Sequence, residues 1–543
     1  MLDDERGGDG GSDGGAGGGH GGRLRARNVA PDDQGGTRSS WMRDAVPDTE
    51  HTLPADLTVD VCVIGAGIAG LSTAYHLTRA GLKVCVVDDG PIGGGETSRT
   101  TAHLASALDD HFHHLEHVHG RDGARLAAAS HAAAIDDIER IVATHGIDCD
   151  FRRVDGYLFA ASRSDVKQLD HELAAARRAG LEVEPLPRAP IPGFDTGPCL
   201  RFGRQAQFHP VRYLAGLARA IIDAGGRIVT GARATDIADG QVQVTVKGGA
   251  RAIRAPSVVV ATNPPITSRL EFPLKQAPYR TYVIAMHVGR GMVPPALFWD
   301  TADPYHYVRT ATTADGDLLI VGGEDHRVGQ DDQPAKRWQR LEAWARERFP
   351  VTAVIDRWSG QVLEPADGLA YIGRTSGKGG DAGGVYVCTG DSGNGITHGA
   401  LAGMLLTDLI TGRKNPWAKL YDPTRKSMRA IGTLIGEAAR SNVPYSDWLK
   451  GGDVREVKDI APGSGAVIRQ GVHMLAVYRD EIGTCHVRSA ACPHLGGVVS
   501  WNPAEKSWDC PCHGSRFDAH GRLIEGPAND DLAEAILQEH REG

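Results

Sequence analysis

Two short stretches near the end of the sequence each place a cysteine close to a histidine. Cys492 and His494 lie in ACPHLGG, and Cys510 and His513 lie in CPCHGS, which gives the pattern C-x-H-x15-C-x2-H. Two thiolates and two imidazoles can bind a pair of irons in which one iron has sulfur ligands and the other has nitrogen ligands. The alternative is a structural zinc site, although zinc motifs favour C-x2–4-C pairs. The pattern predicts a centre that carries electrons one at a time.

The spacing, with Leu-Gly after the first histidine and Gly-Ser after the second, resembles the Rieske [2Fe–2S] family. The resemblance implies four metal ligands, which are Cys492, His494, Cys510 and His513.

The resemblance also reveals two departures from the high-potential Rieske proteins. Gly497 stands where those proteins have a cysteine that forms a disulfide with the counterpart of Cys512. Phe517 replaces a tyrosine whose hydroxyl donates to a cluster sulfur, while the second donor, Ser515, is kept. The resemblance therefore implies that this disulfide is missing and that the cluster potential is lower.

A second candidate site lies in DVCVIGAGIAGLSTAYHLTRAGLKVCVVDD, which begins at Asp60. Its apolar pattern predicts a buried strand, a glycine turn, a helix and a second buried strand that ends at Asp88. Gly65, Gly67 and Gly70 form a G-x-G-x-x-G motif in the context that binds dinucleotides. Gly65 would permit the tight turn, Gly67 the approach of a pyrophosphate, and Gly70 the packing of helix on strand. Asp88 would accept hydrogen bonds from a ribose hydroxyl.

Further stretches resemble the D-amino-acid-oxidase and glycine-oxidase class of FAD enzymes. PIGGGETSRTTAHLAS resembles its second FAD-contacting loop, and VYVCTGDSGNGITHG resembles its closing strand-turn-helix, beside the pyrimidine end of the flavin. His103 departs from the loop pattern, which often has a glycine after this point. The resemblance implies that both loops contribute FAD-binding residues, namely Arg99, Thr100, Thr101, Ala102, Gly390, Gly393, Gly395, Ile396 and Thr397.

The substrate site is predicted less directly. Tyr305, Tyr307 and Arg309, together with His306, are candidate pocket residues in a stretch that reads as antiparallel strands. Arg309 could pair with a substrate carboxylate, and the alternative is a surface arginine on a strand.

The histidine-rich run LDDHFHHLEHVHG, residues 108–120, invites a metal site. However, it lacks the D-x2-H-x4-H spacing of an iron triad, since Val118 stands at the last position. We therefore expect a solvated helix face there.

The composition excludes several classes of function. The chain has 543 residues and a net charge of −9, which argues against a nucleic-acid-binding protein. No apolar run approaches the length of a transmembrane segment, and the start lacks the pattern of a signal peptide. Nine cysteines in a chain of this length do not suggest a disulfide framework. We therefore expect a cytoplasmic protein.

The motifs define the expected domain order. We expect an FAD-binding doubly wound α/β domain with an inserted mixed β-sheet substrate domain, followed by a small antiparallel β Rieske domain. Residues 1–50 form a disordered glycine-rich segment, 51–415 the FAD-dependent oxidoreductase domain, 416–453 a linker, and 454–543 the Rieske domain. The substrate domain lies within about 105–205 and 265–360.

This order resembles a bacterial family of FAD oxidoreductases with a C-terminal Rieske domain. The resemblance implies a dehydrogenase that oxidises a small amine, amino acid or hydroxy acid and passes electrons from FAD to the [2Fe–2S] cluster. An external one-electron carrier would then accept them. One alternative is a reductase that runs in the opposite direction from a ferredoxin-type donor. Another is a non-catalytic redox sensor or electron-relay protein.

Overall fold

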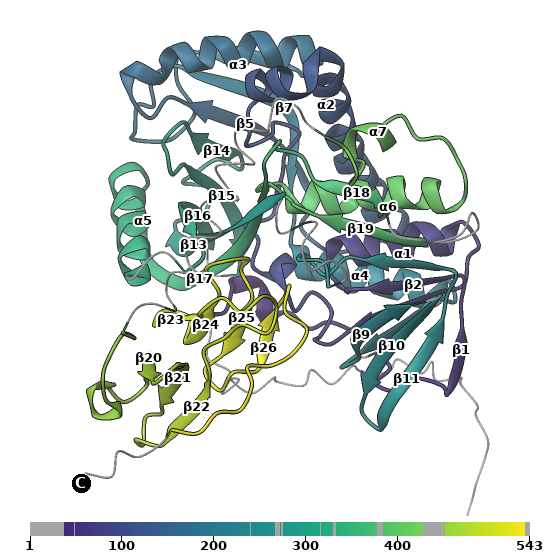
Figure 1. Ribbon diagram of the computed structural model, residues 1–543. Coiled ribbons are helices and arrows are strands. Elements are labelled where there is room, and N and C mark those ends of the chain that lie inside the picture. Colours follow the sequence, from purple (N-terminus) through teal and green to yellow (C-terminus); the bar gives the residue numbers. More distant parts are fainter. Residues whose placement is uncertain are drawn as a thin grey trace, which may run out of the picture. The chain divides into compact units, whose positions relative to one another are not determined.

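The computed structural model describes residues 37–47, 49–238, 240–266, 272, 275–314, 316–329, 333–376, 384–426, 448 and 451–537 (Figure 1). Most of the predicted disordered segment, 1–36, lies outside the described residues, as does most of the predicted linker, 427–447 and 449–450.

The prediction of disorder extends too far at residues 37–47 and 49–50. Ser40–Arg43 forms a 3-10 helix, and the Trp41 side chain is buried. Its indole nitrogen donates to the carbonyl of Thr100 at 2.7 Å. The tryptophan therefore fixes this segment on the folded body.

The nucleotide-binding motif lies on a six-stranded sheet with the order β18-β19-β12-β2-β3-β8. All neighbouring strands run parallel except β18 and β19. The central strands are buried along their whole length, as expected for a parallel sheet covered on both faces. The strands are β2 (Val61–Ile64), β3 (Val84–Asp88), β8 (Arg227–Thr230), β12 (Ser257–Val260), β18 (Tyr371–Arg374) and β19 (Gly384–Thr389).

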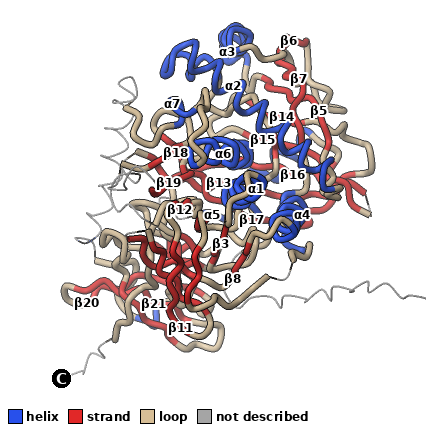
Figure 2. The backbone as a smooth tube through the Cα atoms, turned by 90° about the vertical axis from the view of Figure 1, so that its right-hand side faces the viewer, coloured by secondary structure: helices blue, strands red, loops and turns tan. Residues whose placement is uncertain are grey.

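Helices cover this sheet. α1 (Ile68–Arg79) follows β2 and packs against α4 (Pro210–Asp223) and α6 (Gly395–Ile410). Figure 2 shows these three helices against the strands of the sheet. A smaller four-stranded sheet consists of β1 (Asp56–Thr58), β11 (Gly249–Arg254), β10 (Gln241–Val246) and β9 (Arg233–Ala238).

The predicted substrate domain corresponds to a nine-stranded mixed sheet. Its path is β17-β13-β16-β15-β14-β5-β7-β4, with β6 paired to β7. The strands are β4 (His103–Leu104), β5 (Arg152–Phe159), β6 (Val183–Leu186), β7 (Cys199–Gln207), β13 (Gln276–Val288), β14 (Leu297–Asp300), β15 (His306–Thr313), β16 (Gly316–Arg327) and β17 (Val351–Pro365). Its helices are α2 (Phe112–His145), α3 (Val166–Ala179) and α5 (Pro334–Arg348). β4 joins this sheet directly after the second predicted FAD loop, so cofactor and substrate elements share one framework.

The C-terminal residues form two small antiparallel sheets, shown in light green and yellow in Figure 1. One consists of β20 (Ser464–Gln470), β21 (His473–Arg479) and β22 (Cys485–Ser489). The other consists of β23 (Ser500–Asn502), β24 (Ser507–Asp509), β25 (Arg516–Asp518) and β26 (Leu523–Glu525). Between α6 and these sheets, α7 spans Ala418–Tyr421. No helix among the described residues is long and apolar enough to cross a membrane.

Candidate functional site

A cavity of about 670 Å³ lies where the six-stranded sheet, the nine-stranded sheet and the C-terminal sheets meet. Most of the predicted FAD-binding residues line it. Those that do are Gly65, Gly67, Asp88, Arg99, Thr100, Thr101, Gly390, Gly393, Gly395 and Ile396. Ala102 and Thr397 are buried but do not line the cavity. The two loops and the glycine turn are therefore brought together as the sequence predicts.

The glycine turn has the geometry that a dinucleotide requires. Gly65 has a φ of +110°, a region that favours glycine. A Cβ atom at Gly70 would lie 1.8 Å from the Gly65 carbonyl oxygen, so only glycine allows α1 to approach the turn so closely. α1 begins directly after Gly67, and the first N–H groups of a helix are suited to bind phosphate.

Asp88 holds this turn from the end of β3. Its carboxylate accepts hydrogen bonds from the backbone N–H groups of Ala66 at 2.6 Å and Gly90 at 2.7 Å. Burial raises the pKa of Asp88 to about 7 in spite of these two hydrogen bonds. The carboxylate lines the cavity beside the turn, where a ribose hydroxyl could donate to it.

The second loop is anchored by residues from distant parts of the chain. The Arg99 guanidinium donates to the Ser359 carbonyl at 3.0 Å, and the Trp358 indole donates to the Arg99 carbonyl at 2.7 Å. Ala102 has a φ of +60°, and its carbonyl accepts from the Arg309 guanidinium. Arg99, Thr100 and Thr101 thus face the cavity from a fixed loop.

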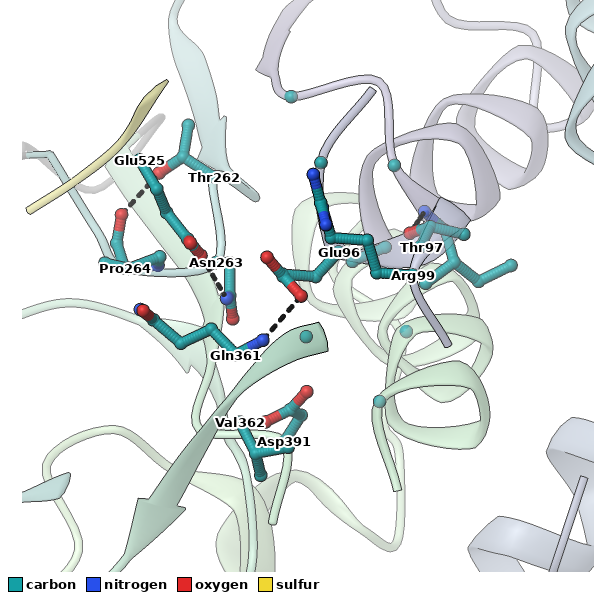
Figure 3. A pocket seen from close by; sticks show the side chains of 18 of the residues that line it. Glu96, Thr97, Arg99, Thr262, Asn263, Pro264, Gln361, Val362, Asp391 and Glu525 are labelled. Atoms are coloured by element: carbon teal, nitrogen blue, oxygen red, sulfur yellow. Dashed lines mark hydrogen bonds between the residues drawn. The ribbon is translucent and has the colours of Figure 1, made fainter. Parts of the chain in front are cut away.

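Gln361 gives an independent indication that the cavity holds a polar cofactor. It lies on β17 and lines the cavity, as Figure 3 shows. Both polar atoms of its side-chain amide are buried and have no hydrogen-bond partner among the described residues. Buried polar atoms are rarely left in this state, and a bound FAD would supply both donors and acceptors. The residues present therefore fit FAD.

The substrate candidates are placed differently from one another. Tyr305 and Tyr307 line the cavity, and their ring centroids lie 5.3 Å apart. Gly322, opposite Tyr307 in the β15–β16 register, makes room for the ring, because a Cβ atom there would lie 2.1 Å from it.

Arg309 does not line the cavity. Its guanidinium is buried away from the cavity and donates to the carbonyls of Ala102 at 2.7 Å and Phe208 at 2.9 Å. His306 is also directed elsewhere, since it pairs with Asp300 at 2.9 Å and stacks on Trp344. Alternation along β15 explains the direction of His306, because neighbouring side chains point to opposite faces of a strand.

Two cavity-lining carboxylates were not predicted from the sequence. Asp109 accepts a hydrogen bond from the Tyr305 hydroxyl at 2.8 Å, and Asp325 lies at the end of β16. Both line the cavity. Asp109 belongs to the histidine-rich run and Asp325 to the GGEDH stretch, so the sequence shows both residues but not that they lie in one cavity. Their convergence depends on the pairing of distant strands.

The histidine-rich run forms the start of α2, as predicted, but it is only partly solvated. His113 pairs with Glu172 at 2.9 Å, and His119 contacts the Asp367 carbonyl at 2.7 Å. Within this run, whose residues the structure describes, no group of three or more His, Asp or Glu side chains is arranged to hold a metal ion.

The four predicted cluster ligands converge in the C-terminal domain. The thiols of Cys492 and Cys510 are within hydrogen-bonding reach of each other, and the ring centroids of His494 and His513 lie 5.0 Å apart. His513 Nδ1 is buried and has no hydrogen-bond partner among the described residues. The site thus offers two sulfur and two nitrogen donors. This set fits a [2Fe–2S] cluster with two ligands per iron.

The loops around the ligands support this arrangement. In one loop the Gly496 N–H donates to the Cys492 carbonyl, and in the other the Gly514 N–H donates to the Cys510 carbonyl at 3.0 Å. The Ser515 hydroxyl accepts from the Ala528 N–H and is also within hydrogen-bonding reach of the Cys492 sulfur.

Gly497 packs directly against the second loop. A Cβ atom at Gly497 would lie 2.5 Å from the Cys512 sulfur. Gly497 is the position where the resemblance puts the partner cysteine. Phe517 is fully buried on β25, so it occupies its site without a hydroxyl.

The second cluster loop docks on the strands that line the cavity. The His513 ring lies in a small apolar pocket that includes Pro278 and Leu363. A Cβ atom at Gly514 would lie 2.6 Å from Pro278 and 3.0 Å from the Gln361 side-chain nitrogen. Gln361 therefore contacts the cluster loop and lines the large cavity.

A buried ionic network fixes this docking. Glu505, with a side-chain exposure of 0%, lies 3.8 Å from Arg280, 3.9 Å from Arg516 and 4.0 Å from Arg99. Its carboxylate also accepts a hydrogen bond from the Thr37 hydroxyl at 2.6 Å. Although burial raises the pKa of Glu505, the three guanidinium groups outweigh this and lower it to about 2.

The C-terminal domain also completes the wall of the cavity. Arg516, on β25, and Glu525, on β26, both line it. The Asn263 side chain donates to Glu525 at 3.1 Å, as Figure 3 shows beside Glu96 and Arg99. The cofactor cavity is therefore shared between the two domains.

Comparison with known proteins agrees with this architecture. Residues 60–409 match the family model of FAD-dependent oxidoreductases, and residues 448–536 match the model of the Rieske [2Fe-2S] domain. A Rieske 2Fe-2S iron-sulfur protein of Bacillus subtilis, YhfW, is 30% identical over 490 residues, which cover 89% of this chain and 95% of that protein. The gamma-glutamylputrescine oxidoreductase of Escherichia coli is 27% identical over 408 residues, covering 71% of this chain and 93% of that protein.

The fold is also similar to solved structures. Glycine oxidase from Geobacillus kaustophilus matches with a TM-score of 0.57 at 20% identity, covering 68% of this chain and 99% of that chain. These matches confirm the predicted fold class, and the two family models confirm FAD and the [2Fe–2S] cluster as the cofactors.

Proposed function

Because this chain belongs to the family of FAD-dependent oxidoreductases and carries a Rieske [2Fe–2S] domain, we propose that it is a dehydrogenase. It oxidises a small amine, amino acid or hydroxy acid and delivers the electrons through the Rieske cluster to an external one-electron carrier. When bound, FAD supplies the ability to accept a hydride, and the cluster supplies transfer of single electrons. The relative that acts on gamma-glutamylputrescine, by its name, supports an amine among the three classes.

The contact between the second cluster loop and the cavity wall supports electron transfer between FAD and the cluster within this chain. His513, a proposed iron ligand, lines a small pocket together with residues of the oxidoreductase domain such as Pro278 and Leu363. Gln361 lies against Gly514 on one side and lines the cofactor cavity on the other. Gln361 therefore connects the cluster loop with the cofactor cavity.

The chain's own residues have distinct parts in this function. The turn at Gly65 and Gly67 and the start of α1 bind the pyrophosphate, while Arg99 and Thr101 border the same cavity. Glu505 and its arginine partners hold the C-terminal domain against β13 and the second FAD loop. An isolated oxidase needs no such attachment, because O2 takes both electrons directly.

An anaerobic screen of amines, amino acids and hydroxy acids for bleaching of the flavin absorbance tests this proposal. With a substrate found, wild-type enzyme should reduce two ferricenium ions per substrate molecule and form little peroxide. Cys510→Ser should still be bleached by substrate in one turnover, because Cys510 does not line the FAD cavity, but it should lose most ferricenium reduction. The flavin content of the variant serves as the folding control. Stoichiometric peroxide at equal rates in both proteins would contradict the proposal.

A further inference from the structure

One wall of the cavity consists of residues from the substrate sheet and from the loop that leads into α2. We call this the inner wall, and it comprises Asp109, Trp299, Tyr305, Tyr307 and Asp325. Trp299 belongs to β14, Tyr307 to β15 and Asp325 to β16, which are neighbouring strands. Two carboxylates and three aromatic rings therefore face the same space.

Asp109 places one carboxylate close to the proposed flavin site. A Cβ atom at Gly393 would lie 2.2 Å from Asp109 Oδ2, so this oxygen lies against the turn that begins the closing helix. The Tyr305 hydroxyl donates to the same oxygen at 2.8 Å and holds it in place.

Asp325 supplies the second carboxylate, and it lacks a donor at one oxygen. Its Oδ1 is buried and has no hydrogen-bond partner among the described residues. An unpaired buried acceptor costs free energy that a bound donor would recover. Its charge also acts on both tyrosines, because it contributes to the raised pKa values of Tyr305 and Tyr307, in which burial is the largest cause.

Positive side chains are turned away from the inner wall. The arginines that line the cavity, Arg99, Arg233, Arg516 and Arg522, come from other parts of it, beside the nucleotide loops and the C-terminal sheet. Arg337 lies behind Asp325 and donates to the carbonyls of Glu324 and Asp325, without lining the cavity. Among the described residues, the inner wall thus offers no lysine or arginine to a substrate carboxylate.

His103, a titratable base that lines the cavity, does not add a positive charge to the inner wall at pH 7. It lines the cavity, but burial lowers its pKa to about 3, so it is neutral at pH 7. Its Nδ1 lies 3.0 Å from the Thr101 hydroxyl, and its ring packs edge-on against Tyr307. His103 therefore adds no positive charge to the inner wall.

We propose that the inner wall binds the substrate as a cation, so that the substrate is an amine whose ammonium group lies between Asp109 and Asp325. This inference rests on the proposed function and narrows its three substrate classes to one. Opposite charges attract strongly where water is excluded, and the faces of Tyr305, Tyr307 and Trp299 favour cations. The same wall repels the carboxylate of an amino or hydroxy acid.

The bound ammonium group must also lose a proton before its neighbouring carbon can release a hydride. Asp325 is placed to accept it: an N–H bond breaks, a carboxyl O–H bond forms, and no electron moves in this step. Burial raises the pKa of Asp325 to about 7, which suits a group that exchanges protons near neutral pH.

Two ligands of matched shape and opposite charge test whether the inner wall prefers a cation or an anion. tert-Butylammonium and pivalate share the same apolar body, and tert-butylammonium cannot be oxidised because its substituted carbon carries no hydrogen. Their dissociation constants can be measured on the FAD- and cluster-loaded protein from the change in flavin absorbance. We expect tert-butylammonium to bind at least tenfold more tightly than pivalate. Equal or tighter binding of pivalate would overturn the inference.

Variants then locate the binding site. Asp325→Asn should weaken tert-butylammonium binding at least tenfold while leaving pivalate binding unchanged or tighter, and Asp109→Asn provides a second test of the same prediction. Asp122→Asn removes an exposed carboxylate on α2 that pairs with Arg125, and it should change neither constant. An equal effect of Asp325→Asn on both ligands, in protein with full FAD content, would contradict the assignment.

The results distinguish a failure of the cation site from a failure of the proposed dehydrogenase function. If a hydroxy acid supports ferricenium reduction while tert-butylammonium does not bind, the cation site is wrong and the electron path stands. If amines bind as predicted but no amine supports ferricenium reduction, the dehydrogenase function is wrong and the cation site stands.

Discussion

Glu505→Gln should release the Rieske domain from its docked position. The Glu505 carboxylate is completely buried and lies within 4.0 Å of Arg99, Arg280 and Arg516. Glutamine keeps the shape of the side chain but removes the charge that balances three guanidinium groups. The remaining positive charges would then repel one another in a site that water does not reach.

The size of the effect follows from the pKa of this carboxyl. Burial alone would raise it, but the arginines lower it from the ordinary value of 4.5 to about 2. Each factor of ten in proton affinity corresponds to about 1.4 kcal/mol, so ionised Glu505 stabilises the folded protein by about 3 kcal/mol. Removing one partner from a buried ionic group costs about 3–5 kcal/mol in other proteins, which agrees with the value derived from the pKa of Glu505.

The pH dependence of this contribution has a definite sign. A carboxyl whose pKa is lowered on folding stabilises the protein at pH values above its unfolded pKa, here 4.5. The contribution is lost as the pH falls through the folded value of about 2. The difference in stability between wild type and Glu505→Gln should therefore be constant from pH 5 to 7 and decrease below pH 4.5.

Urea unfolding followed by the visible circular dichroism of the cluster measures this stability. We expect Glu505→Gln to reduce the free energy of unfolding by about 3–5 kcal/mol at pH 7. The control is Glu481→Gln, because Glu481 pairs with Lys506 at 3.0 Å on the surface and should contribute only about 0–1 kcal/mol. Equal unfolding midpoints for Glu505→Gln and wild type would refute the role of the network.

Two further predictions concern the separate cofactor sites. Gly67→Val should abolish FAD binding while the Rieske EPR signal remains, because a Cβ atom there already lies 3.0 Å from the Thr97 hydroxyl and the larger side chain would occupy the place of the pyrophosphate. Loss of both cofactors from this variant would show that the sites fold as one unit. Ser515→Ala should lower the cluster potential and Phe517→Tyr should raise it, each by about 65–130 mV, since a hydrogen bond to a charged group contributes about 1.5–3 kcal/mol. Redox titration by EPR measures both, and an unchanged potential in Phe517→Tyr would show that the ring does not face a cluster sulfur.

The local motifs could be predicted from the sequence because their chemistry is confined to a few neighbouring residues. The turn at Gly65 depends on a positive φ and on the close approach of α1, and both requirements are met within six residues. The cluster loops are similar, since each brings its own Cys and His pair together. Hydrophobic periodicity then sufficed to identify the doubly wound sheet around the first motif.

The inner wall and the domain interface could not be predicted in this way. Arg309 lies two residues after Tyr307 in the same strand, and alternation would place both on one face. Its guanidinium instead binds the backbone carbonyls of Ala102 and Phe208. The Glu505 carboxylate accepts a hydrogen bond from Thr37, which is 468 residues away in the sequence. Such contacts are set by the packing of distant elements, and no local pattern marks them.

Anaerobic photoreduction of the flavin, with EDTA as the electron donor, tests the central claim most directly because it needs no knowledge of the substrate. The absorbance of FAD and the EPR signal of the reduced cluster are followed together in wild type, with Cys510→Ser as the control that lacks the cluster. If electrons pass from FAD to the cluster within the protein, the cluster signal rises while the flavin is bleached, and wild type takes up three electrons against two in the variant. Complete bleaching of the flavin with the cluster still oxidised would contradict the account.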